Sequence, residues 1–251
     1  MQKLEREGKL KNINMRFTDK KIVITGGSSG IGLATAKMIS EEGGQVVLIS
    51  RKLENLRLAK QNLTERAKIY TVDVTDEGQV SNLFEQLEDI DHIVTAAGPP
   101  AGDMPLLELP VAQAREMFES KYWGQYHVVK HGAPKLRKNG SITLFSGWIS
   151  RKPMVGLPTF AAIDGAIESL TRVLSKELAP IRVNAVTPGA IETPLWNSIE
   201  EETRKNIFKS FADSLPVGRI GQAEDVAKTV TFLMNNDFIT GSIIDVDGGQ
   251  S

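Results

Sequence analysis

A short apolar run that leads into a glycine-rich turn, within residues 21–39, constrains the fold of this chain more than any other feature. Residues 22–24 are three β-branched side chains in a row, which is typical of a strand buried on both faces of a parallel sheet. The glycines after this run permit backbone conformations that are closed to other residues, and they let a ligand approach the chain without a Cβ in the way. These glycines are Gly26, Gly30 and Gly32. The apolar spacing of residues 31–39 then fits one helical face, so the segment predicts a strand, a tight turn and a helix.

The turn between the predicted strand and helix is suited to an anion. Free backbone N–H groups and the positive end of the helix dipole converge at a helix N-terminus, where a pyrophosphate is stabilised. The glycine spacing is GxxxGxG, in TGGSSGIG at residues 25–32, and differs from the GxGxxG of the commonest dinucleotide fingerprint. A tight strand-to-helix loop that binds no ligand is the alternative.

Strands continue to alternate with helices along the chain. Strand-like apolar runs occur at residues 46–49, 69–74, 90–94, 141–145, 181–186 and 242–246, and helical patterns separate them, among them 52–67, 111–131 and 159–178. This alternation predicts an α/β fold with a single Rossmann-type, doubly wound parallel sheet of about seven strands, flanked by helices on both faces. We expect one dinucleotide-binding domain over residues 21–251, a polar, solvated extension at residues 1–20, and a substrate lid at about residues 190–215.

Composition excludes several classes of partner. The formal net charge of −1 gives no basic field for nucleic acid or an anionic membrane surface, and no apolar run is long enough to span a bilayer. The chain has no cysteine, which excludes disulfides and thiolate metal sites and fits a reducing compartment, so we expect a cytoplasmic protein. His127 and His131 are spaced for one helical face, but no third metal ligand accompanies them, and we predict no metal site.

The residues that end the second predicted strand bear on the choice of cofactor. In an open parallel sheet, ligands bind beyond the carboxyl ends of the strands, and Ser50 and Arg51 end the second one. A carboxylate at this place binds ribose hydroxyls and repels a 2′-phosphate, whereas a hydroxyl with a guanidinium favours that phosphate. The sequence therefore favours NADP(H) over NAD(H). The alternative is an ordinary surface arginine.

Five motifs, in order along the chain, resemble those of the classical short-chain dehydrogenase/reductase (SDR) family. They are TGGSSGIG at 25–32, Asp73-Val74, TAAG at 95–98, IRVNAVTPG at 181–189 and VDGG at 246–249. The resemblance implies an NAD(P)(H)-dependent oxidoreductase that acts on a carbonyl or alcohol substrate and forms a homotetramer or homodimer. It also implies cofactor contacts from the matching residues, which are Gly26, Ser28, Ser29, Gly30, Ile31, Gly32, Ser50, Arg51, Asp73, Val74, Ala96, Ala97, Gly98, Pro188, Gly189, Ile191 and Thr193.

The catalytic positions that the resemblance implies are largely changed. SDR chemistry uses a tyrosine hydroxyl to pass a proton, a lysine four residues later that lowers the tyrosine pKa, a serine that holds the carbonyl and an asparagine that organises a relay water. Ser146 matches the serine, and counting onward from it places Phe160 at the tyrosine position and Asp164 at the lysine position. The asparagine position, three residues before Gly124, is Lys121. We therefore predict a divergent member with an atypical active site.

The altered residues could complement each other. If the family geometry holds, Lys121 and Asp164 reach one cavity from neighbouring helices, and a buried lysine needs a counter-charge to stay ionised. We expect an ion pair between them beneath the nicotinamide site, and two unrelated surface charges are the alternative. Lys121 could also donate a proton or polarise a carbonyl, with Ser146 as its partner. Tyr122 and Tyr126 lie on other parts of the helix and are no obvious substitutes for the missing phenol.

Two functional hypotheses follow from these residues. The first is a divergent NADP(H)-dependent carbonyl reductase or alcohol dehydrogenase that uses Ser146 and Lys121. The second is a cofactor-binding homologue that has lost the chemistry and serves a regulatory or assembly role. Because Ser146, Pro188-Gly189 and Thr193 match positions that act around the nicotinamide, the sequence favours the first hypothesis.

Overall fold

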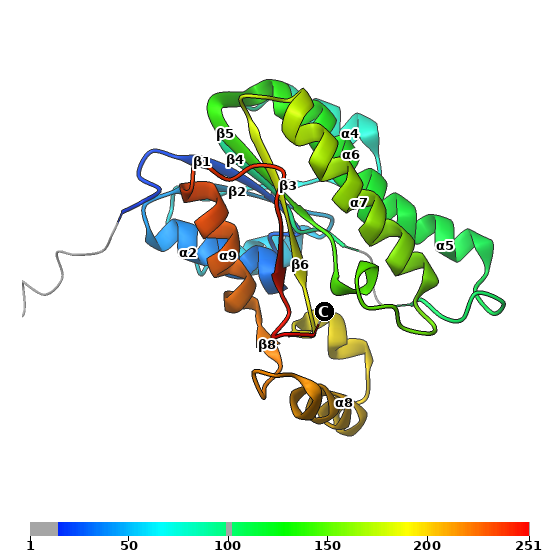
Figure 1. The fold of residues 1–251 in the computed structure, drawn as a ribbon. Coiled ribbons are helices and arrows are strands. Elements are labelled where there is room, and N and C mark those ends of the chain that lie inside the picture. The colour runs from blue at the N-terminus through cyan, green and yellow to red at the C-terminus, as the bar shows by residue number, and fades with distance from the viewer. Residues whose placement is uncertain (1–14, 99–101, 251) are drawn as a thin grey trace, which may run out of the picture.

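The structure, a computed structural model, describes residues 15–98 and 102–250 (Figure 1). Within these residues the chain forms a central sheet of seven parallel strands. In spatial order they are β3 (Lys68–Thr71), β2 (Gln45–Ser50), β1 (Lys21–Thr25), β4 (Ile90–Thr95), β5 (Leu136–Phe145), β6 (Arg182–Pro188) and β9 (Ile243–Val246). The strand order reverses between β1 and β4, so a crevice opens beyond the carboxyl ends of these two strands. The predicted doubly wound parallel sheet is confirmed.

Helices cover both faces of the sheet (Figure 1). One face carries α2 (Gly30–Glu41), α3 (Leu53–Lys60) and α9 (Ala223–Asn235). The other carries α4 (Glu77–Glu85), α5 (Val111–Phe118), α6 (Gly124–Gly132) and α7 (Pro158–Glu177). Each helix buries an apolar stripe against the β-branched residues of the sheet, as Ile39 does from α2 and Ile163 from α7. Full burial of such a side chain stabilises the fold by about 1.5–3 kcal/mol, and these two apolar layers hold the carboxyl ends of the strands in place.

Several elements differ in extent from the sequence prediction. The helix expected at 52–67 ends at Lys60, and the strand expected at 69–74 ends at Thr71. This strand ends early because Asp73 Oδ1 accepts hydrogen bonds from the N–H and hydroxyl of Thr75, which turns the chain. The helix expected at 111–131 contains a π-helical turn, η1 (Glu119–Trp123), between α5 and α6. Two short 3₁₀ helices, η2 (Ala133–Lys135) and η3 (Trp148–Ser150), flank β5.

The segment before β1 packs on the sheet. Of the extension predicted at residues 1–20, residues 1–14 lie outside the described part of the chain. Phe17 is only 1% exposed and packs among the core residues under α2, while Arg16 pairs with Glu42 and Lys20 with Asp91. Phe17 thus anchors residues 15–20 to the folded unit, while the other five residues of this stretch are exposed, as predicted for them. The sequence did not reveal this contact, because one aromatic residue in a polar stretch forms no periodic pattern.

The segment predicted as a lid has secondary structure of its own. It contains β7 (Ile191–Glu192), the 3₁₀ helix η4 (Pro194–Ser198) and α8 (Glu201–Ser214), and β7 pairs with β8 (Gly221–Gln222). Trp196 holds these parts together, because its indole N–H donates to the Ile191 carbonyl at 2.8 Å. Its ring also contacts Phe208 and Phe211, with centroids 5.3 and 6.3 Å away. α8 stands away from the sheet, beyond the end of β6 (Figure 1). None of the helices in the described ranges has the length and apolarity to cross a membrane.

Candidate functional site

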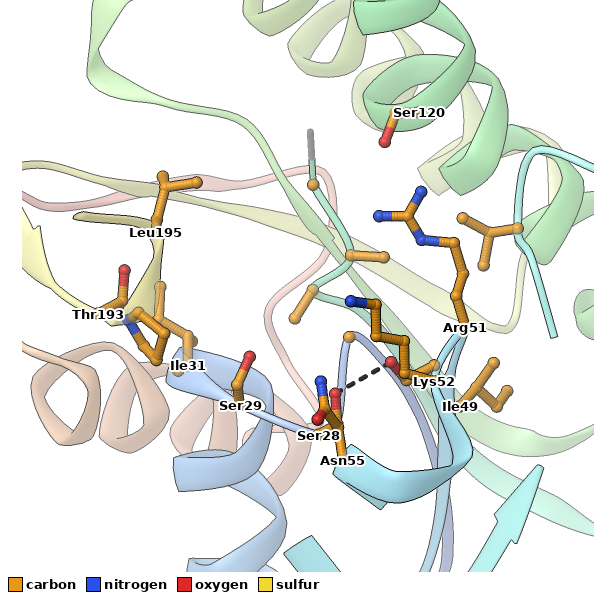
Figure 2. Close-up of a pocket in the computed structure, with 18 of the residues that line it drawn as sticks. Ser28, Ser29, Ile31, Ile49, Arg51, Lys52, Asn55, Ser120, Thr193 and Leu195 are labelled. Carbon is orange, nitrogen blue, oxygen red and sulfur yellow. Dashed lines mark hydrogen bonds between the residues drawn. The ribbon is translucent and has the colours of Figure 1, made fainter. Parts of the chain in front are cut away.

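A polar cleft of 570 Å³ opens at the carboxyl ends of β1, β2 and β4 (Figure 2). The glycine loop, the end of β2 and the first residues of the segment predicted as a lid line this cleft. Most of the predicted cofactor residues line this cleft, namely Gly26, Ser28, Ser29, Gly30, Ile31, Ser50, Arg51, Asp73, Val74, Ala96, Ala97, Gly98 and Thr193. Three of the five sequence motifs, at residues 25–32, 73–74 and 95–98, therefore meet in one crevice although they are far apart in the chain.

The glycine loop has the shape that a phosphate cradle needs. Gly26 has φ +67°, and a Cβ on it would lie 2.6 Å from the Ala96 carbonyl oxygen, so only glycine fits there. Gly30, with φ +50°, begins α2 and leaves its N-terminal N–H groups facing the cleft. Gly32 differs from the prediction because it is buried and does not line the cleft. A Cβ on Gly32 would lie 2.4 Å from the Gly26 carbonyl oxygen, so Gly32 lets the helix pack against the loop.

The end of β2 presents polar and cationic groups to the cleft. The Ser28 hydroxyl donates to the Ser50 hydroxyl at 3.0 Å and joins the glycine loop to the strand end (Figure 2). The exposed Arg51 and Lys52 side chains extend toward the open cleft, and the Arg51 guanidinium lies on the side of Ser120 (Figure 2). Lys52 was missed by the sequence analysis, although a second cation directly after Arg51 is visible in the sequence. These hydroxyl and cationic groups fit the phosphate and ribose groups of a dinucleotide.

A second cavity of 510 Å³ continues from the polar cleft and shares the wall formed by Ala96, Ala97 and Gly98. All four predicted catalytic residues line it. Lys121 comes from η1, Ser146 from the end of β5, and Phe160 and Asp164 from α7. The predicted residues at the end of β6 and after it also lie here, which are Pro188, Gly189, Ile191 and Thr193.

The cavity contains the predicted ion pair between Lys121 and Asp164. The Lys121 Nζ lies 2.5 Å from Asp164 Oδ1, and the two side chains are 13% and 1% exposed. The ammonium also lies 5.4 Å from the centroid of the Phe160 ring, within the range of a cation–π contact. The alternative of two unrelated surface charges is wrong, because both groups are enclosed and bonded to each other.

Burial and pairing act on Asp164 in opposite directions. Burial raises the pKa of the Asp164 carboxyl, the nearby Lys121 ammonium lowers it, and the Glu168 charge raises it slightly, so that the net shift is upward. The loss of water therefore outweighs the attraction of the lysine. It follows that Asp164 would take up a proton readily without Lys121, and that Lys121 would lose its counter-charge without Asp164.

A buried glutamine that the sequence analysis missed fixes the turn that carries Lys121. The Gln125 side chain is enclosed, and its amide nitrogen donates to the carbonyls of Lys121 and Phe145 at 2.8 and 2.9 Å. Its amide oxygen accepts from the Phe145 N–H at 2.8 Å and from the Thr95 hydroxyl at 2.5 Å. Gln125 thus joins the π-helical turn to the strand end just before Ser146. π turns are rare and often occur at functional sites.

A glycine beside Ser146 makes room for the carboxylate. A Cβ on Gly147 would lie 2.5 Å from Asp164 Oδ2, so a larger residue would collide with it. The φ of Gly147 is −169°, which any residue can adopt, and the need for glycine is therefore one of space alone. Ser146 is 4% exposed, and its hydroxyl donates to the Asp164 backbone carbonyl at 3.1 Å.

One further group completes the surroundings of the site. Asp103 accepts the Phe160 N–H at 2.8 Å and caps the first turn of α7, the helix that carries Phe160 and Asp164.

The two helical histidines have other partners: His127 Nδ1 lies 3.0 Å from the Val74 carbonyl, and His131 Nε2 lies 3.0 Å from Glu77. Among the described residues, no group of three or more His, Asp or Glu side chains is arranged to hold a metal ion.

The fold and the cleft define a Rossmann-type dinucleotide-binding protein. A protein-family profile described as "Enoyl-(Acyl carrier protein) reductase" matches residues 26–251. The curated relatives include short-chain dehydrogenase/reductase ATR9 of Stachybotrys chlorohalonatus, which is 35% identical over 244 residues, 91% of this chain and 95% of that protein. They also include the 3-oxoacyl-(acyl-carrier-protein) reductase FabG of Thermotoga maritima, 31% identical over 94% of this chain and 99% of that protein.

Solved structures agree with these relatives. A small-chain dehydrogenase in complex with NADPH is 36% identical, with a TM-score of 0.78 over 92% of this chain and 97% of that one. The MalC reductase/Diels-Alderase of Malbranchea aurantiaca is 25% identical, with a TM-score of 0.86 over 94% of this chain and 98% of that one. The chain belongs to the short-chain dehydrogenase/reductase family, a family of NAD(P)-dependent oxidoreductases.

Proposed function

We propose that this chain is an NADP(H)-dependent oxidoreductase that interconverts a carbonyl compound and its alcohol at an altered reaction centre. The observation that carries the proposal is the Lys121–Asp164 pair, which faces the same cavity as Ser146 at the inner end of the dinucleotide cleft. The choice of NADP(H) is supported by Arg51 and Lys52 at the end of β2 and by the NADPH complex of the similar dehydrogenase. Phe160 and Asp164 take the places of the family's tyrosine and lysine in this proposal.

A bound nicotinamide would supply the hydride for the carbonyl carbon, and the protein supplies the proton and the positioning. The Lys121 ammonium has three N–H donors, and with one on Asp164 another is available to the substrate oxygen. In the direction of reduction this oxygen takes a proton from Lys121, which leaves an alcohol and a neutral amine that solvent reprotonates. Ser146 turns its hydroxyl from the Asp164 carbonyl to the substrate oxygen. Phe160 contributes no proton and shields the ion pair from water.

A binding and turnover experiment tests this proposal. NADPH and NADH are titrated by fluorescence, and the protein is then assayed with a panel of carbonyl and alcohol substrates. We expect Lys121→Met to lower kcat by about 10²–10⁴-fold, the range for loss of a general acid, with NADPH affinity retained. Lys130→Met is the matched control because Lys130 is exposed, pairs with Glu77 and does not line either cavity. Equal turnover by the Lys121→Met protein and the unaltered chain would reject Lys121 as the proton donor.

The second candidate function is that of a cofactor-binding homologue without turnover, in a regulatory or assembly role. It is favoured by Phe160, which has no ionisable proton, and by the Ser146 hydroxyl, which donates to the backbone of Asp164. Tight NADPH binding with no turnover across a broad panel of carbonyls, alcohols and both redox states of the cofactor would select this function over the first.

We also propose that the chain forms a homodimer or homotetramer. Trp123 and Tyr126 are 40% and 37% exposed on the same face of η1 and α6, with their rings 5.4 Å apart, and Tyr122 adjoins them. An exposed aromatic cluster of this kind favours contact with a second chain. Light scattering coupled to size exclusion measures the state, and a monomer at micromolar concentration would reject the proposal. A cytoplasmic location, expected from the lack of cysteine, stays a prediction.

A further inference from the structure

The second cavity has walls made almost entirely of apolar side chains. Trp148 reaches it from the segment after β5, Leu157 and Phe160 from the start of α7, and Trp196, Ile207 and Phe211 from the lid. None of these six residues lines the polar cleft, so they belong to the part of the site that is left for a substrate. The hydroxyl of Ser146 and the ammonium of Lys121 also line this cavity, and both are hydrogen-bond donors that can serve a substrate oxygen.

The cavity has no spare charge. Among the described residues that line it, Lys121 and Asp164 are the ionisable side chains, and they neutralise each other. A carboxylate or phosphate on the substrate would need a cation in place of the water that it loses. If Lys121 moved to that anion, Asp164 would be left enclosed without its partner. The free energy gained by the new ion pair would then be largely offset by the loss of the old one.

The lid adds no cation either. Lys205 pairs with Glu201 at 2.7 Å and Lys209 with Asp213 at 2.6 Å, while Arg204 donates to Asn197 at 3.2 Å. Within the described structure these three cations lie outside the cavity lining. The polar cleft, by contrast, carries Arg51 and Lys52. Recognition by charge is thus concentrated at the cofactor end of the site.

We infer that the substrate of this site is a neutral, largely apolar carbonyl compound without a carboxylate or phosphate, and this inference rests on the proposed function. A cavity of 510 Å³, part of which the nicotinamide would fill, has room for one or two rings. Aromatic walls formed by Phe160, Trp196 and Phe211 suit a flat or alicyclic ring. The carbonyl oxygen would lie between Lys121 and Ser146.

A matched pair of ketones tests the inference. Methyl 4-acetylbenzoate and 4-acetylbenzoate share one ring and one ketone and differ in charge. With NADPH we expect the neutral ester to have a kcat/KM about 100-fold above that of the carboxylate. Ile207→Lys adds a cation to the lining and is expected to raise kcat/KM for the carboxylate by about tenfold. Ile207→Gln adds polarity without charge and is expected to keep the preference for the ester.

Binding measured without turnover separates this inference from the proposed function. Trp148 and Trp196 line the cavity, so tryptophan fluorescence of the NADPH-loaded protein reports entry of either compound. If neither compound is reduced but the ester binds and the carboxylate does not, the proposed function fails and the substrate class stands. Binding or turnover of the carboxylate within about fivefold of the ester overturns the inference, and so does the absence of binding by both compounds at their solubility limits.

Discussion

The two adjoining cavities of this protein are built by different means. The polar cleft is formed around the glycine loop and the strand ends, whose backbone shape local sequence motifs dictate. The second cavity is formed by side chains from separate elements, namely η1, the end of β5, α7 and the lid. Where the main chain itself contacts the ligand, few residues can change without altering the shape of the site. A site made of side chains can change its chemistry when several residues change together.

Lys121, Asp164, Phe160 and Gly147 are such a set. Lys121 has a counter-charge in Asp164, Asp164 has space because position 147 is glycine, and the Phe160 ring covers the ammonium. Changing one member should therefore cost more than changing a residue of comparable type elsewhere. We expect these residues to act as one unit that is independent of the polar cleft.

The largest effect is expected from Asp164→Ala. This change leaves Lys121 as a buried cation without a partner, and we expect the free energy of unfolding to fall by about 3–5 kcal/mol at pH 7, measured by urea denaturation. Asp213→Ala is the control because it breaks the exposed pair with Lys209, for which no measurable loss is expected. Similar stabilities for the two variants would mean that the buried pair contributes no more than a surface pair.

The next largest loss of stability is expected from Gly147→Ala. The added Cβ collides with Asp164 Oδ2, and overpacking of this kind lowers stability by about 1–3 kcal/mol. Gly165→Ala in α7 is the matched control, since a Cβ there has no neighbour within 4 Å and alanine favours a helix. If Gly147→Ala is as well tolerated as Gly165→Ala, the carboxylate does not depend on that space.

Lys121→Met is expected to have a smaller effect that depends on pH. Burial then raises the pKa of Asp164 without the opposing lysine, so the folded pKa lies above the unfolded value. A raised folded pKa gives stability that is fully present below the unfolded pKa and is lost as pH rises through the folded pKa. The variant should therefore lose about 1–2 kcal/mol relative to the unaltered chain at pH 7 and progressively less as the pH falls toward 4. A deficit that stays constant with pH would show that Asp164 does not take up the proton.

Sequence and structure agree best where a feature is local. The strand, turn and helix of residues 21–39 were predictable because apolar spacing and glycine positions act over a few residues. The roles of Gln125 and Gly147 were not predictable. Gln125 resembles any polar helix residue in the sequence, and Gly147 has an extended backbone without a local signature. Their importance comes from partners brought close by the fold, such as Phe145 for Gln125. The Lys121–Asp164 pair spans 43 residues and was predictable only through the family resemblance.

The smallest effect is expected in the polar cleft, where exposed cations act on the cofactor through water. We expect Arg51→Ala to weaken NADPH binding about tenfold, Lys52→Ala to weaken it about threefold, and both to leave NADH binding unchanged. Arg57→Ala on α3 is the control, since this cation does not line the cleft. Because these contacts are exposed, the losses should shrink at high salt, whereas the stability loss of Asp164→Ala should not. If Arg51→Ala weakened NADPH and NADH binding equally, Arg51 would contribute to the shape of the cleft and not to recognition of the additional phosphate.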